Sequence, residues 1–180
     1  DHFAVIREAQ RQFVLTDPNS VLYATIPYDI HQGDKIHLLT HSYIALGRQV
    51  GAQMIERERS GELRSPGPVL EDVYFTRPDR RQIAVAFTNA QGLSGQEAAD
   101  EWFVKDSTHR GFKDGGFVKI SKVTINAEGQ RVLLDLESAP QGDAAVCYAY
   151  RCDVGGSLVN GAGYPAAAFV DVPVALSESR

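Results

Sequence analysis

Residues 126–136, NAEGQRVLLDL, place a turn sequence directly before a nearly alternating run of apolar and polar side chains. Residues 126–129 contain Asn and Gly, which favour a tight hairpin connection. The alternation in residues 130–136 is typical of a strand that packs one face and leaves the other in solvent. We therefore expect two antiparallel strands that meet at this turn.

Further β-rich runs lie on both sides of this hairpin. Turn sequences such as residues 140–143, PQGD, separate them, and no helical pattern intervenes. The runs cover residues 69–76, 82–89, 101–105, 116–126, 130–137, 144–151 and 166–174. Regular spacing of short strands without helices predicts an antiparallel β-sandwich over residues 69–176.

The first 60 residues have a different pattern. An apolar stripe at helical spacing predicts a first helix, and residues 21–26, VLYATI, have the uncharged β-rich character of a buried parallel strand. Thr40 is a suitable N-cap for a second helix. The residues that repeat at helical spacing in the first helix are Phe3, Ile6, Gln10, Phe13 and Val14, and the inward stripe of the second would be Tyr43, Leu46, Gly47, Val50 and Met54.

One strand between two helices cannot form a complete doubly wound domain, because a buried strand needs neighbours. Residues 1–60 are therefore expected to be the C-terminal edge of a larger α/β domain. Residues 61–68 contain two prolines and no periodicity, which indicates a linker to the β-sandwich. The predicted fold class is α/β plus all-β.

Composition excludes several classes of function. The chain has 180 residues, 43% of them apolar, and a net charge of −5, which argues against a nucleic-acid partner. No run of 18 apolar residues exists, so no membrane span is expected, and the N-terminus lacks the features of a signal peptide. Cys147 and Cys152 are too few for a disulfide framework. Two reduced thiols are favoured over a bond across a hairpin.

The strongest candidate for a catalytic motif is residues 34–40, DKIHLLT. In this stretch Asp34 precedes His37 by three residues, just before the predicted second helix. This spacing suits two members of a nucleophile–His–Asp relay. Asp34 would orient the ring of His37, and His37 would take a proton from a hydroxyl nucleophile. The competing interpretation is a surface loop with a structural Asp–His contact.

Two further arrangements use neighbouring residues. Asp29 and His31 form a rival pair with one residue between them, and otherwise His31 would rim the site or face solvent. His37, His41 and Asp34 are plausible zinc-ligand types. If Thr40 caps the helix, however, His37 lies outside it and His41 is exposed in its first turn, so zinc is disfavoured and no cofactor is expected.

A convincing nucleophile is missing from this sequence. Residues 92–96, GLSGQ, lack the last glycine of a nucleophile elbow, because position 96 is Gln96. Ser42 lies inside the predicted second helix, where its hydroxyl would bond the backbone. The isolated chain is therefore expected to be inactive.

Residues 34–47, DKIHLLTHSYIALG, resemble the terminal catalytic block of the SGNH (GDSL-type) hydrolases. Residues 6–10, IREAQ, look like a helix of the catalytic domain in the sialate O-acetylesterase-like members of that family. Residues 158–169, LVNGAGYPAAAF, resemble the closing segment of their β-domain. The resemblance implies residues 1–60 of an SGNH-like α/β domain, a 61–68 linker and a 69–176 β-sandwich.

The resemblance also implies a function, which is serine hydrolysis of O-acetyl esters on glycans without a metal or an organic cofactor. The serine and the oxyanion-hole donors would come from the N-terminal part of the catalytic domain, in the same or another chain. The setting would be extracellular, periplasmic or on a virion surface. Self-association of this chain stays open.

Aromatic residues offer contacts to a sugar. Tyr28 would line the acyl pocket, and Trp102 and Tyr164 are expected to be exposed for stacking, whereas the competing expectation is that such aromatics fill the core. A different class of function, a non-catalytic glycan-binding or assembly module built on the β-sandwich, fits the same residues.

Overall fold

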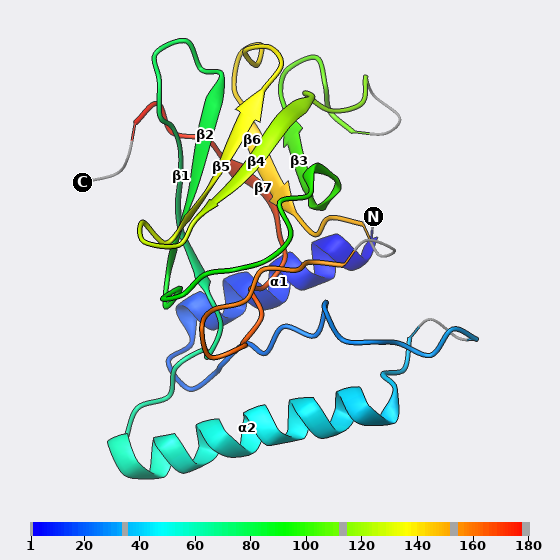
Figure 1. The fold of residues 1–180 in the computed structure, drawn as a ribbon, viewed down its shortest axis with the longest axis vertical. Helices are drawn as coiled ribbons and strands as arrows, with labels where there is room; N and C mark the ends of the chain where they lie inside the picture. The colour runs from blue at the N-terminus through cyan, green and yellow to red at the C-terminus, as the bar shows by residue number, and fades with distance from the viewer. Residues whose placement is uncertain (1, 34–35, 112–114, 152–154, 178–180) are drawn as a thin grey trace.

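The computed structural model describes residues 2–33, 36–111, 115–151 and 155–177. These residues form two α-helices and seven strands, and the strands make two antiparallel sheets. Figure 1 shows the sheets at the top, α1 beneath them and α2 at the foot, with residues 17–33 between the two helices. We call residues 2–60 the helical region and residues 69–177 the β-domain.

The strands follow the seven predicted runs closely. The bounds are α1 His2–Thr16, α2 Thr40–Ser60, β1 Val69–Phe75, β2 Gln82–Thr88, η1 Ala99–Glu101, β3 Trp102–Lys105, β4 Ile120–Asn126, β5 Arg131–Leu136, β6 Ala145–Tyr148 and β7 Phe169–Pro173. One sheet has the order β1-β2-β5-β4 and the other β3-β6-β7. The hairpin expected at residues 126–129 joins β4 to β5, where the backbone N–H of Gly129 donates to Asn126 Oδ1 (2.8 Å).

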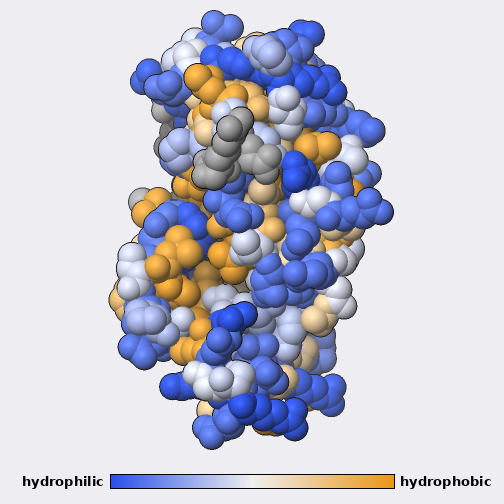
Figure 2. Space-filling view, turned by 90° about the vertical axis from the view of Figure 1, so that its left-hand side faces the viewer, coloured by the Kyte–Doolittle hydropathy of each residue, from blue (hydrophilic) through white to orange (hydrophobic). Residues whose placement is uncertain are grey.

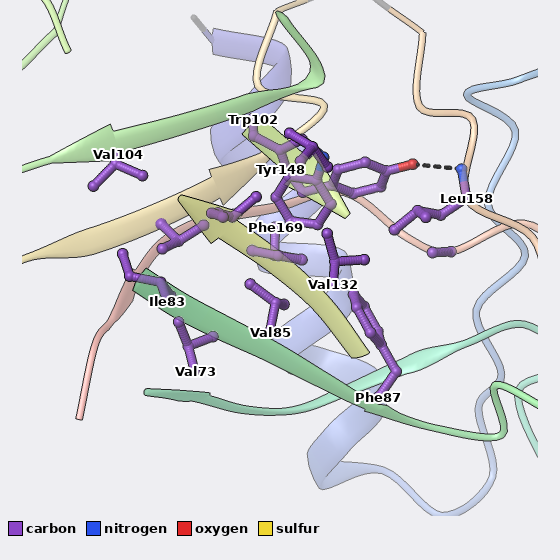
Figure 3. Close-up of a cluster of buried hydrophobic side chains, with 14 of the residues drawn as sticks. Val73, Ile83, Val85, Phe87, Trp102, Val104, Val132, Tyr148, Leu158 and Phe169 are labelled. Atoms are coloured by element: carbon purple, nitrogen blue, oxygen red, sulfur yellow. Dashed lines mark hydrogen bonds between the residues drawn. The ribbon is translucent and has the colours of Figure 1, made fainter. Parts of the chain in front are cut away.

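The two sheets face each other across one shared core. Val85 and Val132 come from the first sheet, and Tyr148 and Phe169 from the second (Figure 3). The phenol oxygen of Tyr148 accepts a hydrogen bond from the backbone N–H of Leu158 (2.9 Å), so the one polar atom of this ring is satisfied. The expected antiparallel two-layer arrangement is confirmed.

Trp102 is a correction to the sequence analysis. Its side chain is only 2% exposed, and its ring lies 4.7 Å from that of Tyr148 and 6.2 Å from that of Phe169. Alternate residues of a strand point to opposite faces, and position 102 of β3 faces the core. Trp102 therefore stabilises the β-domain and does not stack on a sugar.

The helical region departs from prediction at one element and one cap. Residues 21–26 were expected to form a buried parallel strand, but residues 21–25 are assigned to no strand, have no ladder partner among the described residues and are only partly buried or exposed. Thr40 is the first residue of α2 and not its cap, because Leu39 occupies the cap position without a side-chain bond. Neither helix among the described residues is long and apolar enough to cross a membrane.

The segment between α2 and β1 is fixed to the β-domain at its second half. Pro66, Gly67 and Pro68 are buried, and the side-chain amide of Asn160 donates to Pro66 O (2.9 Å). A Cβ at Gly67 would lie 2.1 Å from Pro165 O, so only glycine permits this approach. The predicted linker is therefore held in place from residue 66 onward.

Candidate active site

A short closed loop immediately precedes α2. The backbone N–H of His31 donates to His37 O (2.7 Å), and that of Leu39 donates to Asp29 O (2.9 Å). Ile30 and Leu38 form an antiparallel bridge between these two bonds. The loop thus returns on itself, and its two ends are fixed in register just before the helix begins.

His37 lies at the exposed end of the loop that these backbone bonds close. Its backbone carbonyl is used by the loop, and its side chain is exposed. Asp34 and Lys35 lie outside the described residues, so the structure does not place the carboxylate that we expect to orient the ring of His37. The exposed position is the one that a general base needs if another part of the protein brings the nucleophile.

His31 lies across the loop from His37 and is also exposed. Its Nδ1 accepts a hydrogen bond from the backbone N–H of Gly33 (3.1 Å), which orients the ring. A Cβ at Gly33 would lie 2.8 Å from His31 Cε1, so glycine allows this close approach. His31 is thus exposed beside the loop closure, and its role at the rim of the site stays a prediction.

Asp29 pairs with His41 across twelve residues of sequence. His41 Nε2 lies 2.8 Å from Asp29 Oδ2, and the two side chains are 65% and 71% exposed. His41 is in the first turn of α2, as expected, and a carboxylate near a helix N-terminus is favourable. The pair was missed because the bridge between Ile30 and Leu38, which brings residue 29 beside the helix, leaves no local signal.

Tyr28 and Tyr164 come close to each other between α2 and the β-domain. The Tyr28 hydroxyl donates to Gln49 Oε1 (2.5 Å), and Gln49 Nε2 donates to Gly163 O (3.3 Å). Burial and the neighbouring Tyr164 hydroxyl raise the pKa of Tyr28 above its usual value. Gln49 thus links Tyr28 to the backbone next to Tyr164, whereas Trp102 lies in the core of the β-domain.

Tyr164 lines a cavity of about 840 Å³ that opens beside this contact. Most of its lining is polar and comes from the end of α1, the second half of α2 and the loops around residues 64, 90 and 161. The amides of Asn89 and Asn160 in this lining already bond backbone carbonyls. They therefore shape the wall more than they offer free groups to a ligand.

A second Asp-x-x-His sequence, residues 106–109, was not singled out from the sequence although it has the same spacing as Asp34 and His37. Asp106 Oδ1 lies 3.0 Å from His109 Nδ1, and the Asp106 side chain is 1% exposed. Burial pushes the pKa of Asp106 upward, but backbone N–H groups of Gln141, His109 and Thr108 outweigh burial and hold it well below its usual range. With so many backbone donors, this carboxylate stabilises a turn.

Metal and thiol chemistry have little support in the described part of the chain. No group of three or more His, Cys, Asp and Glu side chains there is arranged to hold a metal ion. Cys147 is a buried free thiol, and burial raises its pKa to about 12, so it stays protonated near neutral pH. Cys152 lies outside the described residues.

Comparison with known proteins adds no family. No protein-family model and no curated protein matches this chain.

Proposed function

We propose that this chain is the C-terminal part of a serine carbohydrate esterase of the SGNH type, which removes O-acetyl groups from glycans outside the cytoplasm. The observation that carries the proposal is the closed loop before α2, which holds His37 exposed at the start of a helix. The uncovered apolar faces of the helical region support a missing catalytic part. The order of helix, loop, helix and β-domain also agrees with the resemblance, whereas the strand expected at residues 21–26 is not formed.

In this proposal, a serine from the N-terminal part of the catalytic domain attacks the acetyl carbonyl carbon. His37 takes the serine proton and then gives it to the departing sugar oxygen, which leaves an acetyl-serine. Water, deprotonated by His37, attacks the acetyl group and releases acetate. Asp34 keeps the ring of His37 in the tautomer that these transfers need.

The experiment joins this chain to the residues that precede Asp1 in its gene and measures hydrolysis of an acetyl ester. His37→Ala should lower kcat by about 10³-fold or more, because a triad acts as one unit. His31→Ala and His41→Ala are matched controls that remove exposed imidazoles from the same loop and helix, and each should cost less than about tenfold. An equal loss in all three variants, or no loss in His37→Ala, contradicts the assignment.

A second candidate function is a glycan-binding or assembly module. The cavity beside Tyr164 favours it, since an aromatic ring in an open, largely polar cavity is a common sugar contact. Titration of the chain with an O-acetylated sialoside decides between the two functions. Saturable binding that Tyr164→Ala abolishes, together with no hydrolysis after the joining experiment, favours the module.

A further inference from the structure

The cavity beside Tyr164 lies where α1, α2 and the loops of the β-domain come together. Its volume of about 840 Å³ is within the range that holds small organic ligands. Part of its lining is apolar and comes from Val14, Leu15, Leu63 and Val69. In Figure 2, hydrophobic side chains gather at mid-height, between the β-domain at the top and the foot of the molecule, with polar side chains above and below them. A lining of mixed polarity suits a ligand that has both apolar and polar faces.

Hydrogen bonds from one buried side chain hold the Tyr164 wall of this cavity in place. Asn160, which is 7% exposed, accepts at Oδ1 from the backbone N–H groups of Ala162 (3.2 Å) and Tyr164 (3.1 Å). Its amide nitrogen donates to Pro66 O (2.9 Å) and to Asn89 O (3.1 Å). One side chain thus joins three segments of the lining, so this wall is formed before any ligand binds.

Other polar side chains of the lining are available to a ligand. In the part of the chain that the structure describes, the side chains of Gln53 and Glu56 in α2 and of Gln91 in the loop after β2 form no hydrogen bond or ion pair. Two of these three groups are amides, which both donate and accept hydrogen bonds. A sugar hydroxyl also donates and accepts, so two amides on opposite sides of the cavity match its bonding capacity.

The charges in the lining disfavour an ionic ligand. Asp17, Glu56 and Glu62 contribute three carboxylates, and Arg64 is the one basic side chain among the described lining residues. The guanidinium of Arg64 pairs with Glu62 (Nη2–Oε2 2.5 Å), so an anion would meet a net negative field. Asp17 accepts from the backbone N–H of Asn19 (3.1 Å), which leaves Glu56 as a single carboxylate for a cation. An uncharged ligand fits this lining best.

We propose that this cavity is a subsite for an uncharged sugar unit, a hexose or an N-acetylhexosamine, with the ring of Tyr164 stacked on the sugar and Gln53 and Gln91 bonded to its hydroxyls. This inference rests on the proposed function only in taking a glycan as the ligand. Gln53 lies twelve residues after His41 in α2, or about 18 Å along the helix axis, so the subsite is remote from the loop that holds His37. An O-acetylated sialoside would enter the cavity by an uncharged unit, with its acidic unit outside.

An NMR titration of the isotope-labelled 180-residue chain with N-acetyllactosamine tests the subsite. The side-chain amide signals of Gln53 and Gln91 should shift and saturate. Tyr164→Ala and Gln91→Ala should each weaken binding at least about tenfold, whereas Tyr164→Phe keeps the ring and should cost less than about threefold. Tyr43→Ala is the matched control, because Tyr43 is an exposed tyrosine of α2 that does not line the cavity, and it should leave the affinity unchanged.

A second titration tests the charge of the ligand with the methyl glycosides of glucose and of glucuronic acid, which differ by one carboxylate. The glucuronide should bind at least about tenfold more weakly, and Glu56→Gln should narrow that difference. Equal or tighter binding of the glucuronide would overturn the proposal. Spermidine that shifts the amides of Gln53 and Gln91 when the sugars do not would identify a cation site and would also overturn it.

The subsite and the esterase can fail separately. No saturable shift of the cavity amides with N-acetyllactosamine overturns the subsite, even if the protein joined to the residues that precede Asp1 hydrolyses the ester through His37. Sugar binding that depends on Tyr164, without ester hydrolysis by the joined protein, supports the subsite and contradicts only the esterase.

Discussion

The β-domain and the helical region treat their apolar side chains in opposite ways. In the β-domain, large residues such as Tyr148, Phe169 and Leu134 are fully buried between two sheets. In the helical region, Phe13 and Met54 are more than half exposed, and residues 21–25 between the helices have no ladder partner in the part of the chain that the structure describes. The difference teaches that the β-domain buries its apolar residues between its own two sheets, whereas the helical region leaves many of them in solvent, as our proposal of a larger catalytic domain expects.

Truncating one aromatic residue in each region gives the largest contrast. Trp102→Ala removes a ring packed between Tyr148 and Phe169, so the free energy of unfolding should fall by about 3–5 kcal/mol. Phe13→Ala in the isolated chain should change it by less than about 0.5 kcal/mol, because Phe13 is 59% exposed. Urea unfolding measures both values. Equal losses would mean that Phe13 is packed in solution and would break the comparison.

The turn at Asp106 should make the β-domain sensitive to acid. The folded-state pKa of Asp106 lies below its unfolded value, so its stabilisation is present above about pH 4 and is lost as the pH falls further. Asp106→Asn should cost about 2–3 kcal/mol near neutral pH, since it weakens several bonds to a buried charge. It should also flatten the fall in stability between about pH 4 and pH 2.

Asp79→Asn is the control for this prediction. Asp79 is an exposed carboxylate that accepts a hydrogen bond from the backbone N–H of Arg81 (3.1 Å). Its replacement should leave the stability and its pH dependence nearly unchanged. Parallel pH profiles for the natural chain and Asp106→Asn would contradict the role given to the buried carboxylate.

Alanine at position 51 tests whether the open side of α2 is also open in solution. Because nothing lies near the added Cβ, Gly51→Ala should stabilise α2 by up to about 1 kcal/mol in the isolated chain. Gly61→Ala is the matched control with the opposite sign, because Gly61 ends α2 with φ +74° and alanine is strained there. Urea unfolding measures both variants, and a loss of stability in Gly51→Ala would contradict the open space beside position 51.

The smallest effect is expected for the pair formed by Asp29 and His41. Both side chains are largely exposed, so Asp29→Asn or His41→Gln should change the free energy of unfolding by less than about 0.5 kcal/mol. A thermal melt at low and high salt measures this. A change of several kcal/mol would show that the loop before α2 depends on the pair and not on its backbone bonds.

Local patterning predicted most elements of the fold. The seven strands, both helices and the turn at Gly129 follow from alternation, helical spacing and turn residues. Burial was predicted less well, because a pattern shows which face is apolar but not which neighbour covers it. Phe13 and Tyr43 belong to the apolar faces that the pattern shows, but both side chains are exposed. Trp102 was expected to be exposed because its neighbours in sequence are polar, but those neighbours do not show which face of the strand it is on, and its side chain is buried.

The candidate site was predicted only in part. The sequence singled out His37 and His31 by their spacing before a helix, and the structure places both on one closed loop. The pairing of Asp29 with His41 depends on the return of the chain at Ile30 and Leu38, which no local motif shows. The Asp106 turn shows that Asp-x-x-His alone does not define a catalytic pair. The role of Asp34 stays a prediction.

The most direct test of the central claim is the rate of acetyl ester hydrolysis by the 180-residue chain, measured alone and joined to the residues that precede Asp1 in its gene. Alone, the chain should not exceed the buffer rate, because it has no convincing nucleophile. Joined, it should hydrolyse the ester with a rate that depends on His37. Robust hydrolysis by the isolated chain, or none by the joined protein, would contradict the view that the helical region is one part of a divided active site.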